Sequence, residues 1–255
     1  MGDPMQLRHI TSIKKYESEF VIDHLNIRDL HLDYVGKSLY DYCFELATKS
    51  NLQSTFLDEH YRCHPEIIEF SNHYIYSSSL GQRMLIKSDL AKTSSTTNSG
   101  LQWINVKGTM DSRKNENDRE VEAIYQLVEH IKRENPGKSL GITTPFKHQK
   151  ERLRSRLLPL LSKNDEIIID TVHRFQGDEK DIMIFSLVVA ENSPESKIRF
   201  LNQQKHLLNV GITRAISSLY IVGDHQYCTD VERKFGKNVL SDLAKYSSRL
   251  NKVID

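Results

Sequence analysis

Two Gly-Lys-Ser tripeptides, at positions 36–38 and 137–139, contain the residue types that could cradle a phosphate. A phosphate loop also needs an earlier glycine, so that successive backbone amides can curl around the phosphates after a strand. The corresponding positions hold His31 and Lys132. The first tripeptide leads into an amphipathic helix and the second connects a helix to a strand, so both lack the required context. Any nucleotide chemistry must therefore be shared with another domain.

Metal-ligating and nucleophilic patterns are equally weak in this sequence. The eleven histidines show no His-x-His or His-Glu-x-x-His spacing, and Cys63-His64 lacks the further paired ligands of a zinc site. The three cysteines, Cys43, Cys63 and Cys228, lie far apart without a Cys-x-x-Cys pair, which favours a reducing compartment. We find neither a nucleophile–base pair nor a glycine fingerprint, so a small-molecule α/β enzyme is disfavoured. We expect no metal site in this chain.

Strands and helices, which the sequence predicts in alternation, must position any functional residues. Apolar runs predict strands at 101–106, 140–144, 167–169, 182–190 and 219–222. Helical spacing predicts helices that contain residues 39–47, 65–70, 121–131, 153–161, 200–210 and 239–250. Residues 88–100 are too polar to pack and are expected to form a mobile loop or a boundary. The alternation predicts an α/β fold with a parallel sheet, helices on both faces, and ligands at the carboxyl ends of the strands.

Composition limits the class of protein. The chain has 255 residues, of which 38% are hydrophobic, so it can bury a sizeable core. The chain has 35 lysine and arginine residues and 34 acidic ones, so its net charge is only +1. Because no overall positive charge attracts a polyanion, any contact with nucleic acid must be local. No apolar run approaches the roughly 20 residues that span a bilayer, and the N-terminus does not resemble a signal peptide. We expect no membrane partner, and a cytoplasmic protein, or a nuclear one in a eukaryote.

Five segments occur in an informative order. They are GDPMQL (2–7), YRCHP (61–65), GITTPFKHQ (141–149), TVHRFQGDEKD (171–181) and LNVGITRA (208–215). Together they resemble the motifs of superfamily 1 helicases, most closely the 5′-to-3′ branch that contains the nonsense-mediated-decay helicase. In this resemblance they are motif III, the tyrosine-arginine element that follows it, and motifs IV, V and VI. The resemblance covers nearly the whole chain and is weakest between residues 8 and 56.

The resemblance implies a RecA-like second motor domain, that is, a phosphate-loop NTPase type of fold without the half that carries the phosphate loop. Residues 1–7 would end a first motor domain. Residues 8–100 would form a helical and irregular lead-in with the tyrosine-arginine element, and residues 101–255 the RecA-like core. Because the sequence opens at motif III, we expect it to be cut from a longer protein.

The resemblance also assigns residues that would catalyse ATP hydrolysis. Arg214 and Arg62 would reach the γ-phosphate, and an arginine delivered from a neighbouring domain contributes about 10³ to 10⁵ in rate. Planar guanidinium groups suit a polyphosphate better than lysines do. Gln6 would sense the γ-phosphate and couple nucleotide state to movement. For each arginine the alternative is an ordinary surface salt bridge, and for Gln6 an ordinary loop glutamine.

Four further residues would lie on the nucleotide side of this site. The resemblance places Tyr61 against the adenine and Glu179 against the ribose, with Gly177 just before Glu179 in the same motif. Gln149, in motif IV, is a weaker candidate. Tyr61 could instead be a core or rim residue, and Glu179 one acid in a charged turn.

A nucleic-acid track is implied at motifs IV and V, where Thr144, Thr171 and His173 would approach the backbone of a single strand. Hydroxyls and backbone amides at strand ends can hold phosphates without a strongly basic surface. The alternative is plain turn chemistry, and His173 occupies a position that varies in the family. These contacts do not distinguish DNA from RNA.

The implied function is the C-terminal motor domain of an ATP-dependent DNA or RNA helicase or translocase, active only as part of a larger protein. ATP with Mg²⁺ would bind between this domain and the first RecA-like motor domain, and the metal would be held by that first domain. Single-stranded DNA or RNA would be the second partner. The alternative is a non-catalytic nucleic-acid-binding or interaction module derived from a helicase.

Overall fold

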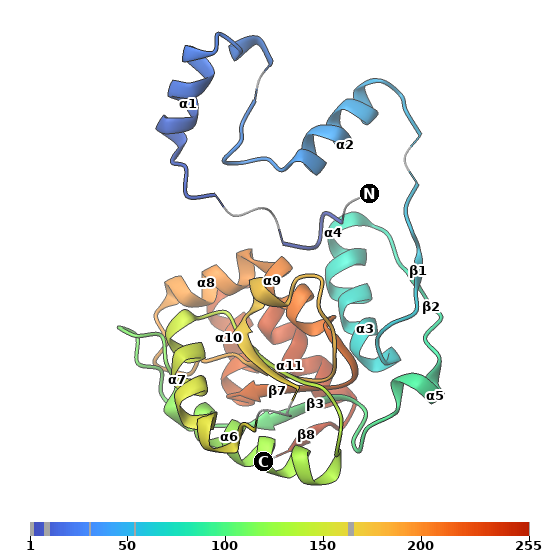
Figure 1. The fold of residues 1–255 in the computed structure, drawn as a ribbon, viewed down its shortest axis with the longest axis vertical. Coiled ribbons are helices and arrows are strands. Elements are labelled where there is room, and N and C mark those ends of the chain that lie inside the picture. Colours follow the sequence, from blue (N-terminus) through green and yellow to red (C-terminus); the bar gives the residue numbers. More distant parts are fainter. Residues whose placement is uncertain (1–2, 8–10, 31, 54, 163–165, 255) are drawn as a thin grey trace. The chain divides into compact units, whose positions relative to one another are not determined.

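The computed structural model describes residues 3–7, 11–30, 32–53, 55–162 and 166–254 (Figure 1). The chain divides into two compact units, residues 1–57 and 58–255, and each is described by itself. The tyrosine-arginine element and motifs IV to VI belong to the second unit, and motif III to the first. Among the helices of the described residues, none combines the length and the apolar character needed to cross a membrane.

The first unit contains short helices with exposed apolar side chains. Its elements are α1 (Lys15–His24), the 3-10 turn η1 (Arg28–Leu30) and α2 (Leu39–Lys49). Helix α2 begins after Ser38, whose hydroxyl accepts from the Asp41 amide while the Asp41 carboxylate accepts from the Ser38 amide. This reciprocal cap stabilises the first turn. The first Gly-Lys-Ser tripeptide therefore caps a helix, in agreement with the prediction.

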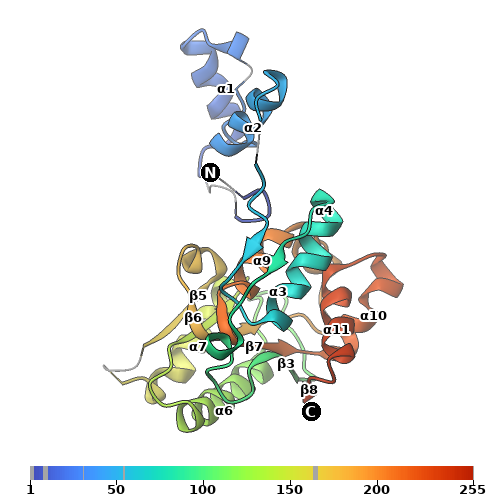
Figure 2. The same ribbon diagram turned by 90° about the vertical axis from the view of Figure 1, so that its right-hand side faces the viewer.

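A six-stranded parallel sheet forms the centre of the second unit (Figure 2). In spatial order its strands are β5 (Ile167–Thr171), β4 (Leu140–Thr144), β6 (Lys180–Ser186), β7 (Ala215–Gly223), β3 (Gly100–Asn105) and β8 (Val253–Ile254). Each neighbouring pair is parallel. The predicted α/β fold with a parallel sheet is confirmed.

Helices cover both faces of this sheet. On one face, α6 (Asp118–Glu134) and α7 (Lys147–Leu157) bury aliphatic side chains against β4, β6 and β7. The other face carries α3 (Pro65–Ser71), α8 (Glu195–Gln203), α9 (Lys205–Ile212), α10 (His225–Phe235) and α11 (Val239–Arg249). Full burial of one aliphatic side chain stabilises the fold by about 1.5–3 kcal/mol, so the two apolar layers fix the sheet between the helices.

Smaller elements complete the second unit. They are the two-stranded parallel sheet of β1 (Glu59–His60) and β2 (Leu85–Ile86), the π-helical turn η2 (Asn72–Ser77), α4 (Ser78–Leu80), α5 (Leu90–Thr93), and the 3-10 turns η3 (Leu158–Leu160) and η4 (Val172–Phe175).

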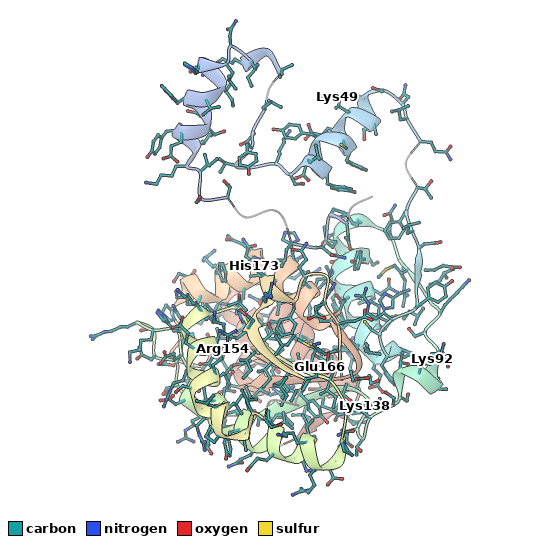
Figure 3. The ribbon with its side chains drawn as sticks, in the orientation of Figure 1. Lys49, Lys92, Lys138, Arg154, Glu166 and His173 are labelled. Atoms are coloured by element: carbon teal, nitrogen blue, oxygen red, sulfur yellow. The ribbon has the colours of Figure 1, made fainter. Side chains whose placement is uncertain are left out.

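Parallel strands give the sheet an amino edge, where strands begin, and a carboxyl edge, where they end. Lys138 and Glu166 precede β4 and β5, and His173 follows β5. Figure 3 labels these three side chains, with His173 at the opposite end of the sheet from the other two. The second Gly-Lys-Ser tripeptide lies at the amino edge, where Ser139 donates to the Asp181 carboxylate at 2.8 Å. It connects α6 to β4, as predicted.

The apolar run at 182–190 does not form one continuous strand. Strand β6 ends at Ser186, and Val188 has a φ of 70°, a conformation that β-branched residues rarely adopt. Val188 is fully buried, and its amide donates to the Glu120 carboxylate at 2.9 Å. The run predicted burial correctly, but hydrophobicity contains no information on where the backbone turns.

Two further predictions need correction. The polar stretch 88–100 is not an unpacked loop, because the hydroxyls of Ser95 and Thr96 bond those of Ser217 and Ser218 at 2.9 and 2.5 Å. The single helix predicted at 200–210 is two helices, α8 and α9. Helix α10 and strand β8 were not predicted.

Candidate functional site

Arg62, Glu179 and Arg214 converge at the amino edge of the sheet. Arg62 Nε lies 2.7 Å from a Glu179 carboxylate oxygen, and Arg62 Nη1 donates to the Thr213 carbonyl at 3.4 Å. Arg214 Nη1 donates to the Asp178 carbonyl at 3.4 Å. Motifs V and VI and the tyrosine-arginine element, far apart in sequence, thus meet here in one cluster.

The Arg214 guanidinium is buried, with 3% of the residue exposed. Its Nε donates to the Val210 carbonyl at 3.2 Å. Burial lowers the pKa of Arg214, and the neighbouring Arg62 lowers it further, although an arginine stays protonated in proteins. The two guanidinium groups therefore repel one another beside the Glu179 carboxylate. A multiply charged anion such as a polyphosphate would relieve this repulsion.

Helix α9 and strand β7 fix the position of Arg214. The Thr213 amide and hydroxyl both donate to the Asn209 carbonyl, at 3.0 and 2.8 Å, and this closes the end of α9. The Arg214 carbonyl accepts from the Lys180 amide at 3.0 Å, which joins it to β6. A Cβ on Gly211 would lie 2.2 Å from the Phe185 ring. Only a glycine therefore allows α9 to pack this closely against the Phe185 ring of β6.

Tyr61 and Arg62 lie in the short connection between β1 and α3. Tyr61 is 60% exposed, and its hydroxyl bonds the Glu59 carboxylate. Beyond Cys63, which is buried, His64 accepts from the Glu66 amide at 3.3 Å and caps α3. The exposed Tyr61 ring could stack on a base.

Among the described residues, Gly177 and Gln6 are placed by local features of the chain. Gly177 has a φ of 89°, in the left-handed region that favours glycine, and it turns the chain from η4 toward Glu179. Gln6 belongs to the first unit, where its side-chain amide donates to the Asp3 carboxylate at 3.1 Å. Gln6 therefore lies in a different unit from Arg62 and Arg214.

The predicted nucleic-acid residues lie at the carboxyl edge. Thr144 ends β4 and is buried, and its hydroxyl accepts from the Phe146 amide at 3.4 Å. Thr171 ends β5 and is partly exposed, and His173 in η4 is exposed. Desolvation lowers the pKa of His173, so its imidazole is neutral near pH 7. The expectation of ligands at the carboxyl edge covers these residues but not the arginine cluster, which lies at the amino edge.

Gln149 is a fully buried member of a polar network. Its Oε1 accepts from the Asn117 amide at 2.9 Å, and its Nε2 donates to the Ser186 hydroxyl at 3.0 Å. Glu120 belongs to the same network, since its carboxylate accepts from the Ser186 hydroxyl at 2.6 Å. Gln149 therefore braces the interior of the unit. Sequence reasoning missed Glu120, which reads as one of many charges on a surface helix.

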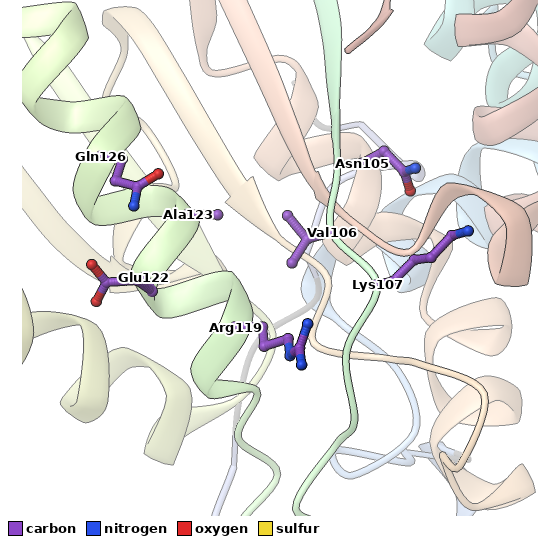
Figure 4. Close-up of a pocket in the computed structure, with 7 residues that line it drawn as sticks. All are labelled: Asn105, Val106, Lys107, Arg119, Glu122, Ala123 and Gln126. Carbon is purple, nitrogen blue, oxygen red and sulfur yellow. The ribbon is translucent and has the colours of Figure 1, made fainter. Parts of the chain in front are cut away.

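A hollow of about 660 Å³ opens beyond the carboxyl end of β3, beside α6 (Figure 4). It is lined by Asn105, Val106, Lys107, Arg119, Glu122, Ala123 and Gln126. The predicted site residues do not line this hollow. In the part of the chain that the structure describes, no group of His, Cys, Asp and Glu side chains is arranged to hold a metal ion.

Comparison with known proteins supplies the family. The model of a family described as an AAA domain matches residues 36–226. The chain belongs to this family. It is 28% identical to the DNA polymerase alpha-associated DNA helicase A of Saccharomyces cerevisiae, over 79% of this chain and 32% of that protein. It is 32% identical to Helicase sen1 of Schizosaccharomyces pombe, over 88% of this chain and 13% of that protein.

A human protein is also similar to this chain. The chain is 29% identical to the probable helicase senataxin of Homo sapiens, over 77% of this chain and 7% of that protein. The chain therefore spans about a third or less of the length of these relatives. The family match and the helicase relatives establish a superfamily 1 helicase-like domain. Its parallel sheet with helices on both faces is the α/β fold class expected from the sequence.

Proposed function

We propose that this chain is the C-terminal motor domain of an ATP-dependent DNA or RNA helicase or translocase. Membership of the family, the helicase relatives and above all the convergence of Arg62 and Arg214 support this function. A first RecA-like motor domain would supply the phosphate loop and the carboxylates for Mg²⁺. The protein would work in the cytoplasm, or in the nucleus of a eukaryote, where its three free thiols stay reduced.

The two arginines would neutralise charge on the γ-phosphate of ATP held between the domains. Hydrolysis transfers the γ-phosphoryl group to water and leaves ADP, and most of the catalysis is positioning and charge stabilisation. The Val210 and Asp178 carbonyls accept hydrogen bonds from the buried Arg214 guanidinium, whereas the Arg62 guanidinium is exposed. An anion that reaches Arg62 competes with the Glu179 carboxylate for its Nε.

The remaining residues of the proposed nucleotide site have smaller roles. Tyr61 would stack on the adenine, Glu179 would accept from the ribose hydroxyls, and Gly177 would let the backbone turn beside them. Gln6 would sense the γ-phosphate. Gln149 is omitted from this site, because its oxygen and nitrogen are both engaged inside the unit.

The test is single-turnover ATP hydrolysis by this chain joined to a phosphate-loop motor domain, with single-stranded nucleic acid present. Arg214→Ala lowers the rate by about 10³ or more, and Arg62→Ala by about 10². The control is Arg199→Ala, which removes an exposed arginine that pairs with Glu195 on α8 and keeps the rate within about twofold. Full activity of Arg214→Ala contradicts the proposal. Nucleic-acid binding without any turnover would favour the non-catalytic module instead.

The carboxyl edge would form part of the single-strand track. Thr144 is buried and would act through the loop it shapes, whereas Thr171 and His173 can reach phosphates directly. Thr171→Val lowers the affinity for a labelled single-stranded oligonucleotide by about threefold, because one hydroxyl contact to the backbone is lost. Thr229→Val, on α10, removes a hydroxyl that bonds the His225 carbonyl and serves as the control. Equal affinities for both variants and the parent would remove Thr171 from the track.

A further inference from the structure

His60 ends β1, immediately before the exposed Tyr61 and Arg62. Its imidazole Nε2 accepts a hydrogen bond from the Cys63 amide at 3.0 Å. This bond runs from a side chain to the main chain across the bend that carries Tyr61 and Arg62. The bend is also fixed at both ends, because β1 pairs with β2 and α3 begins at Pro65.

Cys63 is the point at which this bend enters the core. The residue is fully buried, and its thiol donates to the Thr213 carbonyl at 3.5 Å. A buried backbone amide needs an acceptor, and the His60 ring supplies one. Without this acceptor the Cys63 amide loses its bond, and the bend is free to move.

The position of the bend decides where Arg62 lies relative to Arg214. Arg62 Nη1 donates to the same Thr213 carbonyl that accepts from the Cys63 thiol, at 3.4 Å. Thr213 directly precedes Arg214, so one carbonyl ties the tyrosine-arginine element to motif VI. A shift of about 1 Å in a group that positions a reacting centre can cost about 10² in rate.

The His60 ring can accept only while Nε2 is unprotonated. Burial, followed by the charge of Arg62, lowers the pKa of His60 to about 4. Near pH 7 the ring is therefore neutral, with its proton on Nδ1. A neutral ring also adds no third positive charge beside the two arginines.

We propose that His60 is a positioning residue, whose bond to the Cys63 amide sets the Arg62 guanidinium beside Arg214 in the ATP site. This inference rests on the function proposed above. It assigns to His60 no contact with the nucleotide, so its effect must pass through Arg62.

The experiment measures kcat and KM for ATP in the chain joined to a phosphate-loop motor domain. His60→Leu removes the acceptor and lowers kcat about 10- to 100-fold while KM changes less than about threefold. His60→Gln restores an acceptor and returns kcat to within about threefold of the parent. In an Arg62→Ala background, His60→Leu has no further effect on kcat.

His225→Leu is the matched control, because the His225 ring also bonds the main chain, in its case the Ala244 carbonyl at 3.0 Å, and lies on α10 rather than on the bend that carries Arg62. It lowers the unfolding temperature without lowering kcat. The inference is overturned if folded His60→Gln is as slow as His60→Leu, or if His60→Leu costs the same factor with and without Arg62. Full activity of Arg214→Ala would overturn the proposed function itself, whereas inactive Arg62→Ala with active His60→Leu removes only the role of His60.

Discussion

The two edges of the sheet use polar residues in opposite ways. At the amino edge, Arg62 and Arg214 repel each other beside the Glu179 carboxylate, and both donate to main-chain carbonyls. At the carboxyl edge, Gln149 and Glu120 lie in a buried network whose members bond one another. Excess charge indicates a site that needs a ligand, whereas a fully bonded network indicates a scaffold. In the proposed function, the arginines act on the nucleotide and the buried network stabilises the fold.

The carboxyl-edge network also holds the unusual backbone at Val188. One Glu120 carboxylate oxygen accepts from both the Ser186 hydroxyl and the Val188 amide, at 2.6 and 2.9 Å, and the other accepts from Asn117 Nδ2 at 3.2 Å. These bonds fix the chain where β6 ends. The network therefore stabilises the edge on which Thr144 and Thr171 lie.

Of two changes to this network, Gln149→Ala is expected to lower the free energy of unfolding more than Glu120→Gln does. It leaves the Asn117 amide without its acceptor and lowers the free energy of unfolding by about 2 kcal/mol, as measured by urea denaturation of residues 1–255. The KM for ATP of the joined protein stays unchanged. Gln226→Ala, which removes an exposed bond to Asp230 on α10, is the control and changes little. A raised KM with unchanged stability would return Gln149 to the nucleotide site.

Glu120 makes the free energy of unfolding depend on pH. Burial raises its pKa from 4.5 to about 8, against the opposing bonds from Ser186 and Val188. Because the folded state holds a proton that the unfolded state releases, this contribution is complete below about pH 4.5 and is lost as pH rises through about 8. The slope reaches about 1.4 kcal/mol per pH unit. Glu120→Gln flattens it in urea titrations between pH 5 and pH 8, and an identical slope in the variant would mean that Glu120 is charged when folded.

Much of the fold follows from local patterns in the sequence. The apolar runs of β4 and β5 and the helical spacing of α6 appear where they were predicted, because burial selects residue type directly. The end of β6 could not be predicted, since Val188 turns on a bond to Glu120, which is distant in sequence. The packing of Ser95 likewise depends on the hydroxyl of a distant serine in β7.

The candidate site shows the same division. Motif order predicts that Arg62 and Arg214 serve one site, and the structure places the two arginines near each other, with Arg62 bonded to the carbonyl of Thr213, the residue before Arg214. Their position at the amino edge could not be predicted, because the general rule for parallel sheets places ligands at the carboxyl ends of the strands. His60 was missed because its bond to the Cys63 amide depends on how the bend folds, and a histidine at this spacing has no signature of its own.

The most direct test of a shared arginine site is a double-mutant comparison in the joined protein. Single-turnover ATP hydrolysis is measured for Arg62→Ala, Arg214→Ala and the variant with both changes. If the two guanidinium groups serve one developing charge, the double variant is slowed by about the same factor as Arg214→Ala alone. Losses that multiply, or a single variant with full activity, would contradict the account.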